Sequence, residues 1–234
     1  MDEVYHVLTR GVDKRKIFMD DKDRFRFIHD LYEFNDEDWV GHRNNAYYFN
    51  KALSIDLRGP QLKRRNNSKV RKLLVDILSF CLMSNHYHLI LRPLVQDGVS
   101  KFMRKLNMGY AKYFNIKHKR QGALFEGRYK NILIERDAHY LHLPVYIHLN
   151  PLDIEVPFWR ERPCSSTEIN KAFKILNFYR WSSHLDYLGQ KNFPSVIADR
   201  SIFQFFKDEK EYKKALISWL RAPKIGRIKD YVLE

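Results

Sequence analysis

Two alternating apolar segments, residues 75–83 and 86–93, constrain the fold more than any other feature of the sequence. Their period of two predicts two β-strands, and the two polar residues between them predict a hairpin turn. Because side chains alternate across a strand, His86 and His88 are expected on one face and Tyr87 on the other. Two imidazoles on one face can share a metal ion, although histidines in a strand are more often an ordinary half-buried pair.

The charge of the chain indicates a polyanionic partner. Its 42 Lys and Arg against 28 Asp and Glu give a net charge of +14, which favours nucleic acid through counterion release. We expect no membrane association, because no apolar stretch of about 18 residues occurs. Two widely separated cysteines and an N-terminus without a targeting segment predict a reduced, cytoplasmic protein.

The order of the expected elements predicts the fold class. Strands at 4–10 and 128–135 enclose the hairpin, with one helix after Asp20 and a second over 99–114. This βαββαβ order is that of an α+β, ferredoxin-like (RRM-like) antiparallel sheet with both helices on one face. The first and third strands are central in that plan. If the histidines face away from the two helices, another element must cover them.

Residues 35–71 have no regular period, so we expect an insertion there with at most one short helix. Its basic run, Lys63-Arg64-Arg65, suits a solvated loop and a nucleic-acid contact equally well.

A helix over residues 137–151 is expected next, with Pro144 either kinking it or starting a new one. Tyr146 and Asn150 are four residues apart and therefore share a helix face. A buried core tyrosine and a simple helix C-cap are the competing interpretations of these two residues. Tyr110 and Tyr113 are rival candidate nucleophiles, but they fit the apolar stripe of their own helix better.

Several motifs in this order resemble a known family. The motifs are Thr9-Arg10-Gly11, Leu82-Met83-Ser84-Asn85-His86-Tyr87-His88-Leu89, Tyr113-Phe114-Asn115, Gly122-Ala123-Leu124-Phe125-Glu126-Gly127-Arg128-Tyr129-Lys130, Tyr146-Ile147-His148-Leu149-Asn150-Pro151 and Tyr179-Arg180-Trp181-Ser182-Ser183. Together they resemble the single-tyrosine HUH transposases, and most closely the REP-associated tyrosine transposases of the insertion-sequence transposase superfamily. Pro144-Val145, just before Tyr146, departs from the polar or basic residues that are frequent there.

The resemblance implies a chemistry and a ligand set. It makes Tyr146 the nucleophile, and His86, His88 and Asn150 the ligands of a divalent metal, Mg²⁺ or Mn²⁺. It also implies cleavage and rejoining of single-stranded DNA beside hairpins through a 5′-phosphotyrosine intermediate. An ordinary phenol, with a pKa of about 10, needs help as a nucleophile, and we expect neither His142 nor His148 to be the base.

The remaining expectations concern DNA contacts and domain organisation. We expect a catalytic domain over 1–152, a helical C-terminal extension over 153–234, and either a monomer or a homodimer. Two alternatives stay open: a non-catalytic single-strand-binding module, and a metal-dependent nuclease that activates water. The residues expected to hold the DNA backbone are Arg10, Arg104, Lys105, Arg128 and Lys130.

Overall fold

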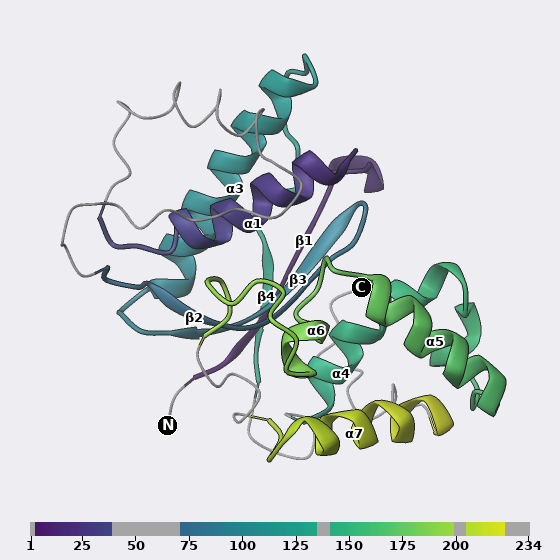
Figure 1. Cartoon of the computed structure of the whole chain (residues 1–234). Coiled ribbons are helices and arrows are strands. Elements are labelled where there is room, and N and C mark those ends of the chain that lie inside the picture. Colours follow the sequence, from purple (N-terminus) through teal and green to yellow (C-terminus); the bar gives the residue numbers. More distant parts are fainter. Residues whose placement is uncertain (1–2, 39–70, 135–140, 199–204, 223–234) are drawn as a thin grey trace.

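A four-stranded antiparallel sheet lies at the centre of the computed structural model, which describes residues 3–38, 71–134, 141–198 and 205–222 (Figure 1). The strands lie in the order β2-β3-β1-β4, so the first and third strands are central. Their bounds are Tyr5–Arg10 (β1), Val75–Leu82 (β2), His86–Pro93 (β3) and Lys130–Leu133 (β4). The expected ferredoxin-like order is confirmed, although β4 is shorter than the sequence indicated.

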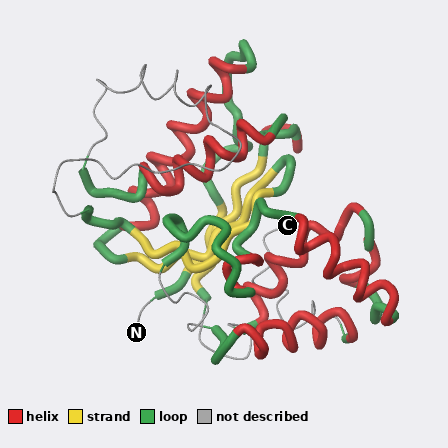
Figure 2. The backbone as a smooth tube through the Cα atoms, viewed as in Figure 1, coloured by secondary structure: helices red, strands yellow, loops and turns green. Residues whose placement is uncertain are grey.

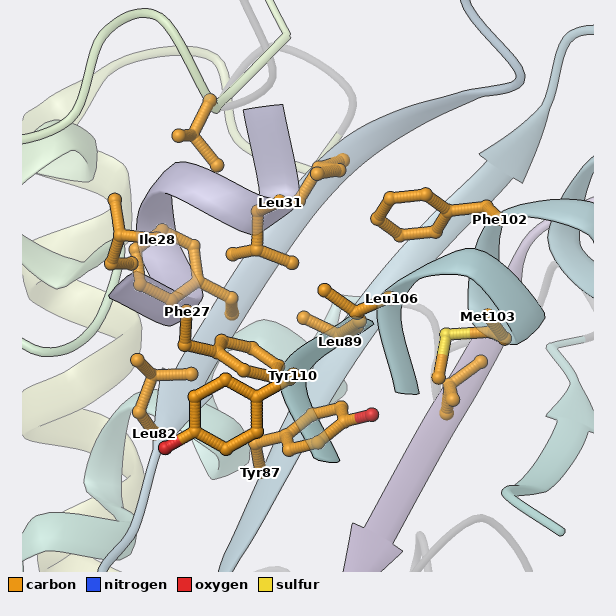
Figure 3. Close-up of a cluster of buried hydrophobic side chains, with 14 of the residues drawn as sticks. Phe27, Ile28, Leu31, Leu82, Tyr87, Leu89, Phe102, Met103, Leu106 and Tyr110 are labelled. Atoms are coloured by element: carbon orange, nitrogen blue, oxygen red, sulfur yellow. The ribbon is translucent and has the colours of Figure 1, made fainter. Parts of the chain in front are cut away.

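Helices α1 (Asp21–Glu33) and α3 (Gly98–Lys117) cover one face of the sheet. The side chain of Asp20 accepts a hydrogen bond from the backbone N–H of Asp23, which is the expected N-cap of α1. The apolar sides of both helices pack on alternate residues of β3. Figure 3 shows this core, with members that include Phe27, Ile28, Leu31, Tyr87, Leu89, Phe102, Leu106 and Tyr110.

The other face of the sheet is covered by the C-terminal half of the chain (Figures 1 and 2). A second apolar core joins Ile90 of β3 to Val145 and Leu149, and to Leu216 and Trp219. The helices that form this core are α4 (His142–Leu149), α5 (Ser166–Phe178), α6 (His184–Tyr187) and α7 (Glu209–Arg221), together with the 3-10 helices η3 (Asn150–Ile154) and η4 (Pro157–Arg160). A further 3-10 helix, η1 (Val12–Lys14), follows β1. This arrangement fulfils the expectation that another element covers the histidine face.

Edge strand β2 is covered by the tail motif around Trp181. Leu82 N–H donates to Trp181 C=O at 2.8 Å, and Ser183 N–H donates to Phe80 C=O at 3.0 Å. The hydroxyl of Tyr179 donates to the carbonyl of Leu82. The motif therefore satisfies edge groups of the sheet that would otherwise be open to pairing with another chain.

Several expectations fall wholly or partly outside the described residues. They are most of the 35–71 insertion with its basic run, the start of the helix expected over 137–151, and parts of the C-terminal extension expected over 153–234. Within the described parts of the chain, no helix is long and apolar enough to cross a membrane.

Candidate active site

His86 and His88 lie on the face of β3 that is turned away from α1 and α3. Tyr87 and Leu89 contribute to the core beneath those helices, whereas Ile90 belongs to the core beneath α4. The two imidazole rings are 5.0 Å apart between centroids and nearly perpendicular, with His88 fully buried and His86 half-buried. The shared face that was expected from the strand period is therefore present.

Each of these histidines has a neighbour at its Nδ1 atom. His86 Nδ1 lies 2.7 Å from Asn85 Oδ1, and because an amide oxygen only accepts, His86 Nδ1 carries the proton. His88 Nδ1 lies 3.0 Å from Nε2 of His6, which is also fully buried, on β1. If His88 Nδ1 donates in this pair, both histidines keep a lone pair on Nε2, the arrangement in which outer partners orient metal-binding imidazoles.

Tyr146 and Asn150 are brought to this face by α4. The rings of Tyr146 and His88 are 6.3 Å apart between centroids, edge to face, and the Tyr146 side chain is fully buried. Asn150 directly follows α4, and its amide N–H donates to the carbonyls of Tyr146 and Ile147, both at 3.2 Å. Asn150 is thus a helix cap, as one interpretation expected, while its oxygen points to a different neighbour.

That neighbour is Arg160 of η4, a residue that the sequence motifs did not single out. Its guanidinium donates to the hydroxyl of Tyr146 at 2.5 Å and to Oδ1 of Asn150. The Asp153 carboxylate accepts from Arg160 Nε at 3.0 Å and from a terminal nitrogen at 2.8 Å. Trp159 Nε1 donates to the same carboxylate at 2.6 Å. Neither helical nor strand spacing links Arg160, Asp153 and Trp159 to Tyr146, because η3 and η4 are short 3-10 helices joined by a turn.

The donor set is compatible with a divalent ion. Within the described ranges, no three His, Cys, Asp or Glu side chains gather as a metal site, so a site here needs the amide of Asn150 as its third protein ligand. Two imidazoles and an amide oxygen would form an uncharged donor set, in which the oxygen is a donor that Mg²⁺ and Mn²⁺ favour and the imidazoles are donors more typical of Zn²⁺, Cu²⁺ and Fe²⁺. The oxygen of Asn150 has two lone pairs, one of which is directed to Arg160.

The expected DNA-contacting residues divide between two faces. In the strand register Arg10 is opposite His86, and Lys130 is opposite Leu8, which in turn is opposite His88. Directly paired residues of an antiparallel sheet point to the same side, so Arg10 and Lys130 share the histidine face. Arg128 is exposed just before β4.

Arg104 and Lys105 are on α3, which covers the opposite face. Arg104 is exposed there. Lys105 Nζ instead donates to backbone carbonyls after α1, at 3.3 Å from Glu37 and 3.2 Å from Asp38. The five residues therefore do not all lie on the histidine face, because α3 covers the opposite face of the sheet.

The two rival tyrosines are core residues. The hydroxyl of Tyr110 donates to the Ile17 carbonyl at 2.6 Å, and that of Tyr113 donates to the Asp23 carboxylate at 3.1 Å. Burial raises the pKa of both phenols well above the ordinary value, and for Tyr113 the Asp23 charge adds to the effect. Both hydroxyls already donate to partners in the core beneath α1 and α3, whereas the ring of Tyr146 contacts His88, so Tyr146 is the better candidate.

His148 points away from Tyr146 into a separate buried polar network. Its Nε2 is 3.0 Å from Ser79 Oγ and 2.7 Å from Ser183 Oγ, and its Nδ1 is 2.8 Å from the Tyr212 hydroxyl. Burial lowers the pKa of His148 well below its usual value, and nearby His184 adds to this effect. His148 is therefore a structural residue in this arrangement, in agreement with the expectation that it is not the base.

The ferredoxin-like sheet bears a histidine pair and is faced by a helix that carries a tyrosine and ends at an amide, which is the arrangement that the resemblance to the single-tyrosine HUH transposases implies. Residues 50–150 match the family model described as "Transposase IS200 like". The match covers less than half of the chain and agrees with the expected resemblance to the insertion-sequence transposases over that segment.

Among solved structures, the chain is similar to a REP-associated tyrosine transposase bound to a REP hairpin. The identity is 12% and the TM-score 0.44, over 86% of this chain and 87% of that one. No curated protein matches the chain.

Proposed function

We propose that this protein is a metal-dependent transesterase that cleaves and rejoins single-stranded DNA at hairpin-flanked sites. Tyr146 is the proposed nucleophile, and His86, His88 and Asn150 are the proposed ligands of Mg²⁺ or Mn²⁺. The observation that carries the proposal is the contact between Tyr146 on α4 and His88 on β3. Tyr146 and His88 come from segments far apart in the sequence, and the chain matches a transposase family model over residues 50–150, which supports the proposal.

The proposed step is a phosphoryl transfer to tyrosine. The phenolic oxygen of Tyr146 forms a bond to the scissile phosphorus, and the bond from phosphorus to the 3′ oxygen breaks. The phenolic proton ends on the released 3′-hydroxyl. The covalent intermediate keeps the phosphodiester energy, so a 3′-hydroxyl can reverse the step without ATP. When bound, the divalent ion supplies charge that polarises the phosphodiester.

Arg10 and Lys130 share the histidine face and are proposed to hold the DNA backbone beside the site. Arg128, exposed just before β4, is proposed to extend this contact. Arg104 is proposed to contact a more distant part of the DNA, because α3 lies on the other face of the sheet. Lys105 is the weakest member of the proposed set, since backbone carbonyls already hold its ammonium group.

The test is covalent capture of DNA. The protein is incubated with Mg²⁺ or Mn²⁺ and a labelled hairpin-ended single strand, then separated on a denaturing gel. We expect an adduct for the native protein, none for Tyr146→Phe, and a normal adduct for the control Tyr113→Phe. Absence of an adduct with every hairpin substrate, together with unchanged activity of Tyr146→Phe, would contradict the proposal.

The two alternatives predict different results in the same experiment. A hydrolytic nuclease would still cut as Tyr146→Phe, would stop cutting as His86→Ala, and would not rejoin strands. A single-strand-binding module would bind DNA and never cut it. A binding module would not need Tyr146, whereas the ring of Tyr146 lies 6.3 Å from that of His88 between centroids, which favours the transesterase.

A further inference from the structure

Arg160 joins the three polar groups of the candidate site that lie beyond the sheet. One terminal nitrogen donates to the Tyr146 hydroxyl at 2.5 Å, and the other donates to Asn150 Oδ1 and to Asp153. The guanidinium carbon lies 4.9 Å from the centre of the Tyr146 ring and 4.7 Å from that of Trp159. The Arg160 side chain is mostly buried and its partners Tyr146 and Asn150 are fully buried, whereas Asp153 is exposed.

Asp153 fixes the orientation of this guanidinium. Its two oxygens accept from Nε and from a terminal nitrogen of Arg160, which is the bidentate geometry that a planar guanidinium favours. The indole N–H of Trp159 holds the same carboxylate. Other N–H groups of the guanidinium are directed at Tyr146 on α4 and at Asn150, which follows α4.

We propose that Arg160, oriented by Asp153, is a positioning residue for the nucleophile Tyr146. This inference rests on the proposed function and adds a residue to it. Arg160 holds the phenolic oxygen in one place and direction, and its positive charge stabilises the negative charge that develops there during attack. As a DNA strand enters, the same planar fork is suited to receive the oxygens of the scissile phosphodiester.

In the proposed reaction, Tyr146 must reach DNA from a buried position. Tyr146 is fully buried, and its hydroxyl is held by Arg160 of η4. In the proposal, Arg160 keeps this contact while the scissile phosphodiester binds beside it, so the phenolic oxygen stays in the position from which it attacks.

The test compares single-turnover cleavage of the hairpin-ended strand by Arg160→Ala, Arg160→Lys and Asp153→Asn. We expect Arg160→Ala to lower the cleavage rate at least 10-fold, with less than a 3-fold change in DNA affinity. Arg160→Lys keeps the positive charge but loses the planar guanidinium. Its cleavage rate should therefore lie between the rates of Arg160→Ala and the native protein. Asp153→Asn should lower the rate by a smaller factor than Arg160→Ala. Guanidinium ion at tens of millimolar should restore part of the Arg160→Ala rate.

The matched control is Arg162→Gln, which removes a neighbouring arginine that pairs with Glu168 at 2.7 Å on the surface. We expect native cleavage from this variant. The inference is overturned if Arg160→Ala cleaves at the native rate. The inference is also overturned if Arg160→Ala loses activity that guanidinium ion does not restore and also melts at a lower temperature. That result would assign Arg160 to folding. Failure of the proposed function is separate, because the native protein itself would then give no adduct.

Discussion

At the scale of single residues, the site depends on partners that orient its histidines. His88 contacts His6 on the neighbouring strand, and the two rings are stacked with centroids 5.2 Å apart. Both rings are fully buried, so each imidazole has little freedom to rotate. A partner of this kind fixes which nitrogen of His88 can face a metal ion.

Replacing His6 should therefore weaken the metal dependence of the reaction without removing a ligand. For His6→Gln we expect about 10- to 100-fold lower cleavage at limiting Mn²⁺, as for other outer partners of metal ligands. Measuring cleavage against Mn²⁺ concentration checks this, and high Mn²⁺ should restore much of the rate. For His88→Ala, in contrast, we expect no restoration. Equal Mn²⁺ dependence of His6→Gln and the native protein would show that His6 does not orient His88.

At the scale of elements, α4 is held in place by a buried polar network that reaches three other segments. His148 of α4 contacts Ser79 of β2, Ser183 of the tail motif and Tyr212 of α7. The pairing of β2 with β3 is irregular between Ile77 and Ser79, and Ser79 reaches the α4 side at this point. The tail thus contributes to the position of the helix that carries Tyr146.

The Tyr212 hydroxyl lies at the centre of this network, 2.8 Å from His148 Nδ1 and 2.7 Å from His184 Nδ1. Tyr212→Phe leaves both buried imidazoles without this partner, which should cost about 2 kcal/mol of unfolding free energy. Urea denaturation measures the change. The control Tyr5→Phe removes only a surface hydrogen bond to Glu3, and we expect less than about 0.5 kcal/mol. Equal stability of the two variants would contradict a structural role for the network.

At the scale of the whole molecule, the net charge of +14 predicts DNA binding that weakens steeply with salt. The contribution of a given cation depends on what already holds it. Lys130 is exposed on edge strand β4, whereas the Lys105 ammonium group is bonded to backbone carbonyls near the end of α1. Lys130 can therefore bind a phosphate without losing such contacts, whereas Lys105 would first have to give up its hydrogen bonds to backbone carbonyls.

For Lys130→Gln we expect the slope of log affinity against log salt to become shallower by about 1, and for Lys105→Gln a smaller change. Titrating a fluorescent hairpin strand at several salt concentrations measures both slopes. An unchanged slope in Lys130→Gln would remove this residue from the proposed backbone contact. A change in Lys105→Gln as large as that expected for Lys130→Gln would show that Lys105 leaves its carbonyl partners to bind DNA.

The sequence alone predicted the sheet, its strand order, and the shared face of His86 and His88. These features follow from local periods, because a strand alternates every residue and a hairpin joins neighbouring segments. The pairing of Tyr146 with Asn150 could likewise be proposed from helical spacing and from the family motif. Strand alternation and helical spacing depend only on residues close together in the chain, so the sequence is enough to predict them.

Tertiary structure alone decided what surrounds those residues. Arg160 meets Tyr146 only because η3 and η4 turn the chain back along α4, and no periodic pattern encodes that turn. His6 meets His88 through the register of β1 with β3, which places Leu8 opposite His88 and His6 opposite Ile90. The cover over the histidine face comes from helices distant in the chain, because burial of a sheet face depends on which apolar surfaces fit together. The sequence therefore determined the reactive groups, and the packing of distant segments determined their partners.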